Sequence, residues 1–199
     1  MKMRKGFTLI ELSIVLIIIG LIIGAVIKGK DLINSSNQKK IYNTWVKEWQ
    51  IAANTYQDRT GSVLADSNTS GGTATEEDGY FDNVDLSTTT SVQEVLKKVG
   101  LDVPLGNVPS KNGGAYSIKG KHITSEAQIH LVALSATGNN KNYLQINNLP
   151  TDVAIAFDTI TDGKLDPQGG SFLGWDGSAL LTEWPDVETT ATVTVLLEM

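Results

Sequence analysis

Three carboxylates lie close together around a turn in the C-terminal part of the chain. Asp158, Asp162 and Asp166 recur at every fourth position, and Gly163 follows the second of them. Carboxylates and backbone carbonyls are the ligands that a hard cation such as Ca²⁺ prefers, although this spacing is not that of an EF-hand loop. The pattern leaves two interpretations: a Ca²⁺ site formed by the three aspartates, or a solvated Asp-Gly turn without metal.

A second group capable of chemistry is a single carboxylate in an apolar segment near the N-terminus. Residues 7–27 contain Glu11, and their other clearly polar members are Thr8 and Ser13. A charged residue at the centre of a bilayer costs about 2.5–3.5 kcal/mol, and this cost falls towards the interface. Glu11 either reaches the headgroups or stabilises the first helical turn through the helix dipole, or it pairs with the amino group of a neighbouring identical helix.

Signals of catalysis are absent from the sequence. It contains no Gly-x-Ser-x-Gly element, no Walker loop and no dinucleotide-binding glycine fingerprint. The absence of Cys excludes thiolate nucleophiles, disulfides, iron–sulfur clusters and Cys-ligated zinc. The formal net charge of −6 argues against a general nucleic-acid-binding protein, which carries a basic face. We therefore expect a protein that is not an enzyme and that requires no nucleic acid binding.

The N-terminal segment has the length and composition of a membrane-spanning helix. The basic residues Lys2, Arg4 and Lys5 precede the apolar segment 7–27, which would form a helix roughly 31 Å long, close to the ~30 Å hydrocarbon core of a bilayer. A secretory signal peptide has a shorter apolar core, so we expect the segment to be retained. Lysines on both sides leave the orientation undecided by the positive-inside rule, and translocation of the long downstream part favours a cytoplasmic N-terminus.

The residues around Glu11 resemble a known processing signal. The sequence Lys5-Gly6-Phe7-Thr8-Leu9-Ile10-Glu11-Leu12, followed by an apolar run to Gly20, is similar to the class III signal of type IV prepilins and type II secretion pseudopilins. The resemblance implies that an inner-membrane prepilin peptidase cuts between Gly6 and Phe7 on the cytoplasmic face and methylates the new amino group of Phe7. It also implies that Glu11 meets the Phe7 amino group of an adjacent subunit during assembly.

This resemblance implies a structural subunit of an extracellular type IV pilus-like filament, or alternatively a pseudopilin of a type II secretion system. The implied partners are further copies of the chain in a helical filament, the prepilin peptidase and the inner-membrane assembly machinery. The subunit pool would lie in the inner membrane, and the filament would be extracellular or span the periplasm. Some pseudopilins use Ca²⁺ to order a C-terminal loop. An alternative of another class is a monomeric membrane-anchored binding domain.

Two glycines in the apolar segment have the spacing of a helix-contact motif. Gly20 and Gly24 form a Gly-x-x-x-Gly pattern, which allows close approach of helices in lipid or in a filament core. The alternative is ordinary span composition, because Gly is frequent in membrane helices. Family filaments often melt this region with the help of a proline, but no Pro precedes Pro104.

The composition divides the chain into four parts: a leader peptide at 1–6, a hydrophobic transmembrane or filament-core helix segment at 7–27, an amphipathic continuation of the helix at 28–58 and a globular head at 61–199. In the amphipathic part, Trp45, Trp49 and Tyr56 recur at helical spacing. We expect these aromatic side chains to pack against the head.

The head has the patterns of a mostly antiparallel sheet. Ser91-x-x-Glu94 has the form of a capping box for a short helix ending at Gly100, Pro150 opens a further helix, and residues 61–90 resemble an exposed acidic loop. Alternating segments predict strands at 115–119, 129–134, 143–146 and 190–197. The predicted fold class is α+β and pilin-like, with a long N-terminal α-helix packed on a small, mostly antiparallel β-sheet head.

Overall fold

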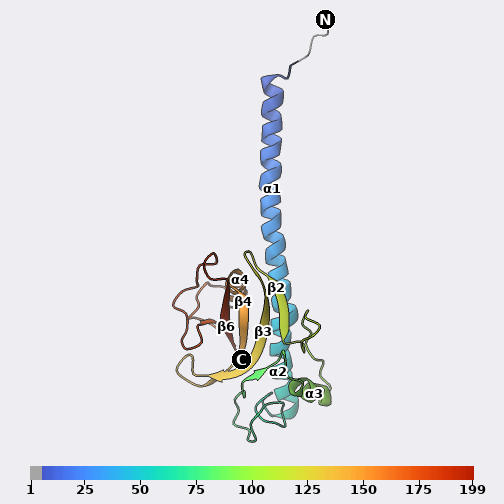
Figure 1. Ribbon diagram of the computed structural model, residues 1–199, viewed down its shortest axis with the longest axis vertical. Coiled ribbons are helices and arrows are strands. Elements are labelled where there is room, and N and C mark those ends of the chain that lie inside the picture. Colours follow the sequence, from blue (N-terminus) through green and yellow to red (C-terminus); the bar gives the residue numbers. More distant parts are fainter. Residues whose placement is uncertain (1–5) are drawn as a thin grey trace. The chain divides into compact units, whose positions relative to one another are not determined.

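The computed structural model describes residues 6–199, so the leader residues 1–5 lie outside the described part of the chain (Figure 1). The chain forms two compact units, one ending at Gln38 and the other comprising Lys39–Met199. A long N-terminal helix and a six-stranded antiparallel sheet confirm the predicted α+β class. The division into leader, apolar helix, amphipathic helix and head remains a prediction.

The helical part of the chain consists of three consecutive elements. Helix α1 (Leu9–Ile41) is followed by the π-helical segment η1 (Tyr42–Val46) and by helix α2 (Lys47–Thr60). Gly61 ends α2 in the left-handed conformation (φ 78°) and donates its N–H to the Gln57 carbonyl, which is the usual glycine termination of a helix. No pattern in the sequence had indicated the wider turn of η1.

The aromatic residues of this helix form the centre of the core, as predicted. Trp45 and Trp49 have no exposed surface, and Tyr56 is buried as well. Both indole N–H groups donate to the same acceptor, the Gly113 carbonyl oxygen, at 3.0 Å each. Gly113 has a φ of 84°, and a side chain there would collide with the Pro104 carbonyl, so only glycine fits this position. The loop that contains Gly113 is thereby fixed to the helix.

The strands form one antiparallel sheet in the order β1-β3-β4-β6-β5, and β2 also pairs with β3. Their bounds are β1 Val84–Asp85, β2 Ala115–Lys119, β3 Thr124–Leu134, β4 Lys141–Pro150, β5 Phe172–Trp175 and β6 Thr192–Glu198. Strand β2 lies where it was predicted, whereas β3 and β4 extend beyond the predicted segments. The short strands β1 and β5 were not predicted, because two and four residues are too few to show an alternating pattern.

The two faces of the sheet differ in character because successive side chains alternate between them. On one face, Ile129, Leu131 and Ile146 join the large core cluster that also contains Trp45 and Trp49. The opposite face carries a second, smaller apolar cluster and a polar region. The buried members of the second cluster are Val132, Tyr143, Leu173 and Leu196.

Both short helices were predicted, but the predicted cap of one of them is not formed. Helix α4 (Thr151–Asp162) begins after Pro150, as predicted. Helix α3 (Ser91–Lys98) was also predicted, but the capping box is not formed. Ser91 lies inside the helix, and its hydroxyl donates to the Gly71 carbonyl at 2.8 Å. A distant backbone acceptor has therefore replaced the local cap.

The segment between α2 and α3 is only partly the exposed acidic loop that was predicted. Residues 73–80 are exposed, but Leu64 and Asp66 are buried. The Asp66 carboxylate accepts the backbone N–H groups of Asp78 and Gly79 at 3.0 and 2.9 Å. The prediction is therefore wrong for the first residues of the loop, because this carboxylate folds the loop back on itself while Leu64 joins the core. It is also wrong for the end of the loop, where Phe81 and Leu86 are buried and Val84–Asp85 form β1.

Candidate processing and assembly site

The N-terminal helix exposes its apolar side chains. Among the described residues, α1 has no buried member: Leu9 at its start is 92% exposed, and Phe7 just before the helix is 88% exposed. The described residues contain one helix that is long and apolar enough to cross a membrane, and this segment begins it. Large apolar patches in contact with water are unstable, so lipid or protein must cover this surface. This supports a membrane-anchored precursor.

The start of α1 is built as a capping box. The backbone N–H and the hydroxyl of Thr8 both donate to Oε2 of Glu11, each at 2.8 Å, and the Glu11 N–H approaches the Thr8 hydroxyl oxygen at 3.3 Å. These contacts satisfy N–H groups that the first helical turn leaves without partners. The Thr-x-x-Glu spacing was the signal for this cap, and sequence reasoning had assigned the capping box to Ser91 instead.

The cap leaves half of the carboxylate free. Both donors from Thr8 reach Oε2, whereas no hydrogen bond from the described residues reaches Oε1 of Glu11. Gly6 and Phe7 precede the helix and are exposed. The candidate cleavage site is thus accessible beside a carboxylate with one oxygen available to a further donor.

The two glycines of the helix-contact pattern lie on the surface of α1. A Cβ atom built at Gly20 or at Gly24 would meet no atom within 4 Å. Because the two residues are four positions apart, they share one helix face and leave a shallow strip there. The strip suits close approach of a second helix, and its use in assembly remains a prediction.

The three aspartates of the predicted Ca²⁺ site are positioned by α4 and the loop after it. Asp158 is completely buried, and its Oδ2 accepts hydrogen bonds from the Asp166 backbone N–H and the Trp184 indole, both at 2.9 Å. Asp162 accepts the backbone N–H groups of Ser171 and Phe172. Each carboxylate therefore holds a part of the C-terminal loop.

This arrangement does not resemble a cation site. Within the described residues, no group of three or more acidic or histidine side chains is placed to hold a metal ion. Asp166 points back to its own loop, where its Oδ1 accepts the Gln168 N–H at 3.0 Å. Of these three aspartates, Asp158 alone has a buried carboxylate oxygen, Oδ1, that lacks a hydrogen-bond partner among the described residues. The geometry thus gives no support to Ca²⁺ at Asp158, Asp162 and Asp166.

The buried position of Asp158 changes its titration. Burial raises the pKa of this carboxyl above its usual value, hydrogen bonds from Trp184 and Asp166 oppose the increase, and the neighbouring carboxylates of Asp162 and Asp166 add to it. Desolvation penalises the charged form of an acid, which explains the direction. Asp158 therefore has a structural role, and burial disfavours the charged form of its carboxyl.

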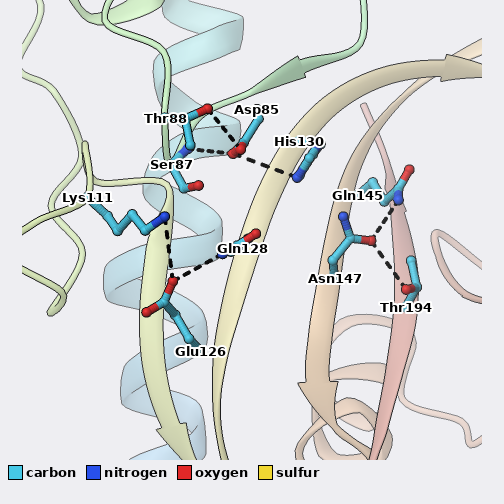
Figure 2. Close-up of polar contacts among 10 residues, drawn as sticks. All are labelled: Asp85, Ser87, Thr88, Lys111, Glu126, Gln128, His130, Gln145, Asn147 and Thr194. Carbon is cyan, nitrogen blue, oxygen red and sulfur yellow. Dashed lines mark hydrogen bonds and ion pairs between the residues drawn. The ribbon is translucent and has the colours of Figure 1, made fainter.

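A second polar cluster lies where β1 meets β3 (Figure 2). Asp85 accepts hydrogen bonds from the Ser87 N–H at 2.8 Å and the Thr88 hydroxyl at 2.9 Å, and Nε2 of His130 lies 3.7 Å from its Oδ1. Partial burial raises the pKa of Asp85, but the hydrogen bonds from Ser87 and Thr88 and the imidazole of His130 outweigh it and hold the pKa below its usual value. The cluster ties the turn after β1 to β3.

Amide side chains continue this polar region across the outer face of β3, β4 and β6 (Figure 2). Gln145 donates to Oδ1 of Asn147 at 2.7 Å, and Thr194 donates to the same oxygen at 3.2 Å. Gln128 donates to Glu126 at 3.0 Å. These half-buried groups satisfy one another and present no nucleophile paired with a base, so they form a solvated sheet face.

The comparisons with known proteins agree with the N-terminal geometry. A family model described as the prokaryotic N-terminal methylation motif matches residues 1–27. No curated protein and no solved structure matches the chain. The matched segment contains Gly6, Phe7 and the Thr8–Glu11 cap.

The motif points to a structural subunit and not to an enzyme. It implies processing by a prepilin peptidase and assembly into pilus-like filaments. The methylation signal, the apolar helix that carries it and the α+β head together support membership of the type IV pilin and pseudopilin family.

Proposed function

We propose that this protein is a structural subunit of an extracellular type IV pilus-like filament. Cleavage between Gly6 and Phe7 and methylation of Phe7 produce the mature subunit, and parallel packing of the N-terminal helices produces the filament. The observation that carries this proposal is the exposed apolar helix with Glu11 near its start, where Thr8 donates to Oε2 and leaves Oε1 for a donor of another subunit.

Cleavage changes both the charge and the start of the helix. It removes Lys2, Arg4 and Lys5, three of the 16 basic residues, and leaves the 22 acidic residues in place. The basic anchor on the cytoplasmic side is lost, and a new amino group appears at Phe7, one residue before the Thr8 cap. The mature helix is therefore held in the bilayer by its apolar surface alone.

That apolar surface requires a new cover when the helix leaves the bilayer. Fifteen large apolar side chains within residues 7–27 are exposed, each by about half or more. Covering them contributes about 1–1.5 kcal/mol each, on the order of 15–20 kcal/mol per subunit relative to water. Only other copies of the same helix offer a comparable environment, so extraction and polymerisation are coupled.

Glu11 supplies the polar contact that distinguishes a filament from a bilayer. In lipid its charge is costly, whereas the Phe7 ammonium of an adjacent subunit would neutralise it at Oε1 while Thr8 continues to hold Oε2. Removing one partner from a buried charge pair is strongly destabilising, so a misplaced subunit would lose this contact. The pair thereby favours one register between neighbouring helices.

Mass spectrometry of the protein purified from cells tests the proposal. We expect loss of residues 1–6 and the added mass of one methyl group on Phe7, together with filaments in sheared fractions from cells that carry the gene and none from cells that lack it. An intact N-terminus would refute the proposal and favour a monomeric membrane-anchored binding domain. Filaments restricted to the periplasm would favour the alternative of a type II secretion pseudopilin.

A further inference from the structure

The polar part of α1, residues 28–40, carries a stripe in which an exposed aliphatic side chain lies between two lysines. Residues four, seven and eleven positions apart fall on the same helix face. Lys28, Leu32 and Lys39 are related in this way, and all three are exposed, Leu32 by 74%. We call this set the first stripe.

A second stripe of the same kind runs along another face of this segment. Lys30, Ile33 and Lys40 are three and seven positions apart, and all are exposed, Ile33 by 63%. At 100° per residue the two stripes lie roughly 130° apart around the helix axis. In each stripe an exposed aliphatic side chain is flanked by charged ones, which matches in miniature the apolar centre and polar rim of a protein interface.

The charge of this segment is opposite to that of residues 41–199. Residues 28–40 contain four Lys and one Asp, a net charge of +3, whereas residues 41–199 contain nine Lys and Arg against twenty Asp and Glu, a net charge of −11. Within residues 41–199, ion pairs within 4.0 Å involve only the carboxylates Glu126, Asp85 and Glu198. The surface of this part is thus anionic and largely uncompensated.

Membrane insertion does not account for the four lysines. With a cytoplasmic N-terminus they follow the span on the translocated side, where positive charges oppose the positive-inside rule. After cleavage, no Lys or Arg remains on the cytoplasmic side to balance them. The four lysines therefore disfavour the proposed orientation of the helix in the membrane, and we expect a favourable interaction outside the membrane to offset this cost.

We propose that the two stripes are docking surfaces for the acidic heads of two neighbouring copies of this chain in the filament. This proposal rests on the proposed function, because only a polymer supplies such neighbours. A helical polymer is built from head-to-tail contacts, in which each subunit meets its identical neighbours through two different surfaces. Opposite charge selects and steers the contact, and Leu32 and Ile33 supply its apolar centre.

Charge reversal in the full-length chain tests the two stripes separately. The variants are K28E/K39E for the first stripe and K30E/K40E for the second. The matched control is K97E/K98E, which reverses two exposed lysines of α3. The measurement is the amount of sheared filament divided by the amount of cleaved, methylated subunit. We expect a fall of about tenfold or more for each stripe variant and a change below about twofold for the control.

Unchanged filament yield in both stripe variants would overturn the proposal. An equal loss in K97E/K98E would also overturn it, because net charge alone would then explain the effect. If the stripe variants instead disappear from the membrane fraction before cleavage, the lysines bind anionic headgroups and the proposal is wrong. Wild-type cells without filaments or without methylated Phe7 would overturn the proposed function itself, which the stripe variants do not address.

Discussion

The shared acceptor of the two buried tryptophans allows a quantitative test of the core. Replacing Trp45 or Trp49 singly by Phe removes one indole N–H, while the other still occupies the Gly113 carbonyl oxygen. Each single change costs about 0.5–1.5 kcal/mol for the hydrogen bond, with about 1 kcal/mol more for the lost volume. The double change leaves the carbonyl without a donor in a buried site, which adds about 1–2 kcal/mol beyond the sum.

Urea unfolding of the full chain in detergent, followed by far-UV circular dichroism, measures these free energies. We expect a coupling energy of about 1–2 kcal/mol between Trp45→Phe and Trp49→Phe. The control pairs Trp45→Phe with Trp184→Phe, since the Trp184 indole donates to Asp158 and shares no acceptor with Trp45. That pair should be additive within about 0.5 kcal/mol. Additivity in the tryptophan pair of the helix would refute the role of the shared carbonyl.

The remaining predictions concern the helix cap, two titrating carboxylates and metal binding. Thr8→Val should lower the filament yield, whereas Thr8→Ser, which keeps the hydroxyl, should give a yield near that of the wild type. The reason is that the cap hydroxyl contributes about 1 kcal/mol and orients Glu11; equal yields from the two variants would contradict this. Asp85 has a lowered pKa in the folded state, so its contribution to stability is present above about pH 4 and is lost as the pH falls further, and Asp85→Asn should flatten the acid limb of the stability curve. Asp158 has a raised pKa, so stability should fall as the pH rises above its unfolded value near 4, and Asp158→Asn should remove this slope in urea titrations. EDTA or added Ca²⁺ should leave the thermal midpoint of the head unchanged, because backbone N–H groups occupy the carboxylates; an increase of several degrees with Ca²⁺ would contradict the geometry.

The sequence predicted the elements whose pattern is long enough to be read. The apolar run and the spacing of Trp45, Trp49 and Tyr56 predicted the helix and its buried face, and alternation predicted β2 and the centres of β3 and β4. Strand β5 was missed because its four residues include Gly174, and pairing with β6 rather than intrinsic propensity makes it a strand. Local pattern is informative only where several residues repeat it.

Polar side chains were harder to place because their partners are distant in sequence. Ser91 had the spacing of a cap, yet its hydroxyl bonds Gly71, twenty residues earlier. Asp158 and Asp162 had the composition of a cation site, yet their carboxylates accept hydrogen bonds from backbone N–H groups of the following loop. Thr8 and Glu11 differ in this respect, since the partners are three residues apart. Their Thr-x-x-Glu spacing could have predicted this cap, but the capping box was predicted at Ser91 instead.

The same contrast between apolar and polar groups bears on assembly. Lipid tails and neighbouring helices are about equally apolar, so moving the segment 7–27 from the bilayer into a bundle changes the hydrophobic free energy little. The apolar surface therefore keeps the subunit out of water without choosing between membrane and filament. On our proposals, that choice falls to the groups that lipid satisfies poorly, which are the Glu11 carboxylate and the lysine stripes of residues 28–40. Substitutions among the aliphatic residues of the helix should accordingly leave the filament yield unchanged if they preserve volume. Loss of a single polar partner should lower the yield, because the contact is repeated at every subunit.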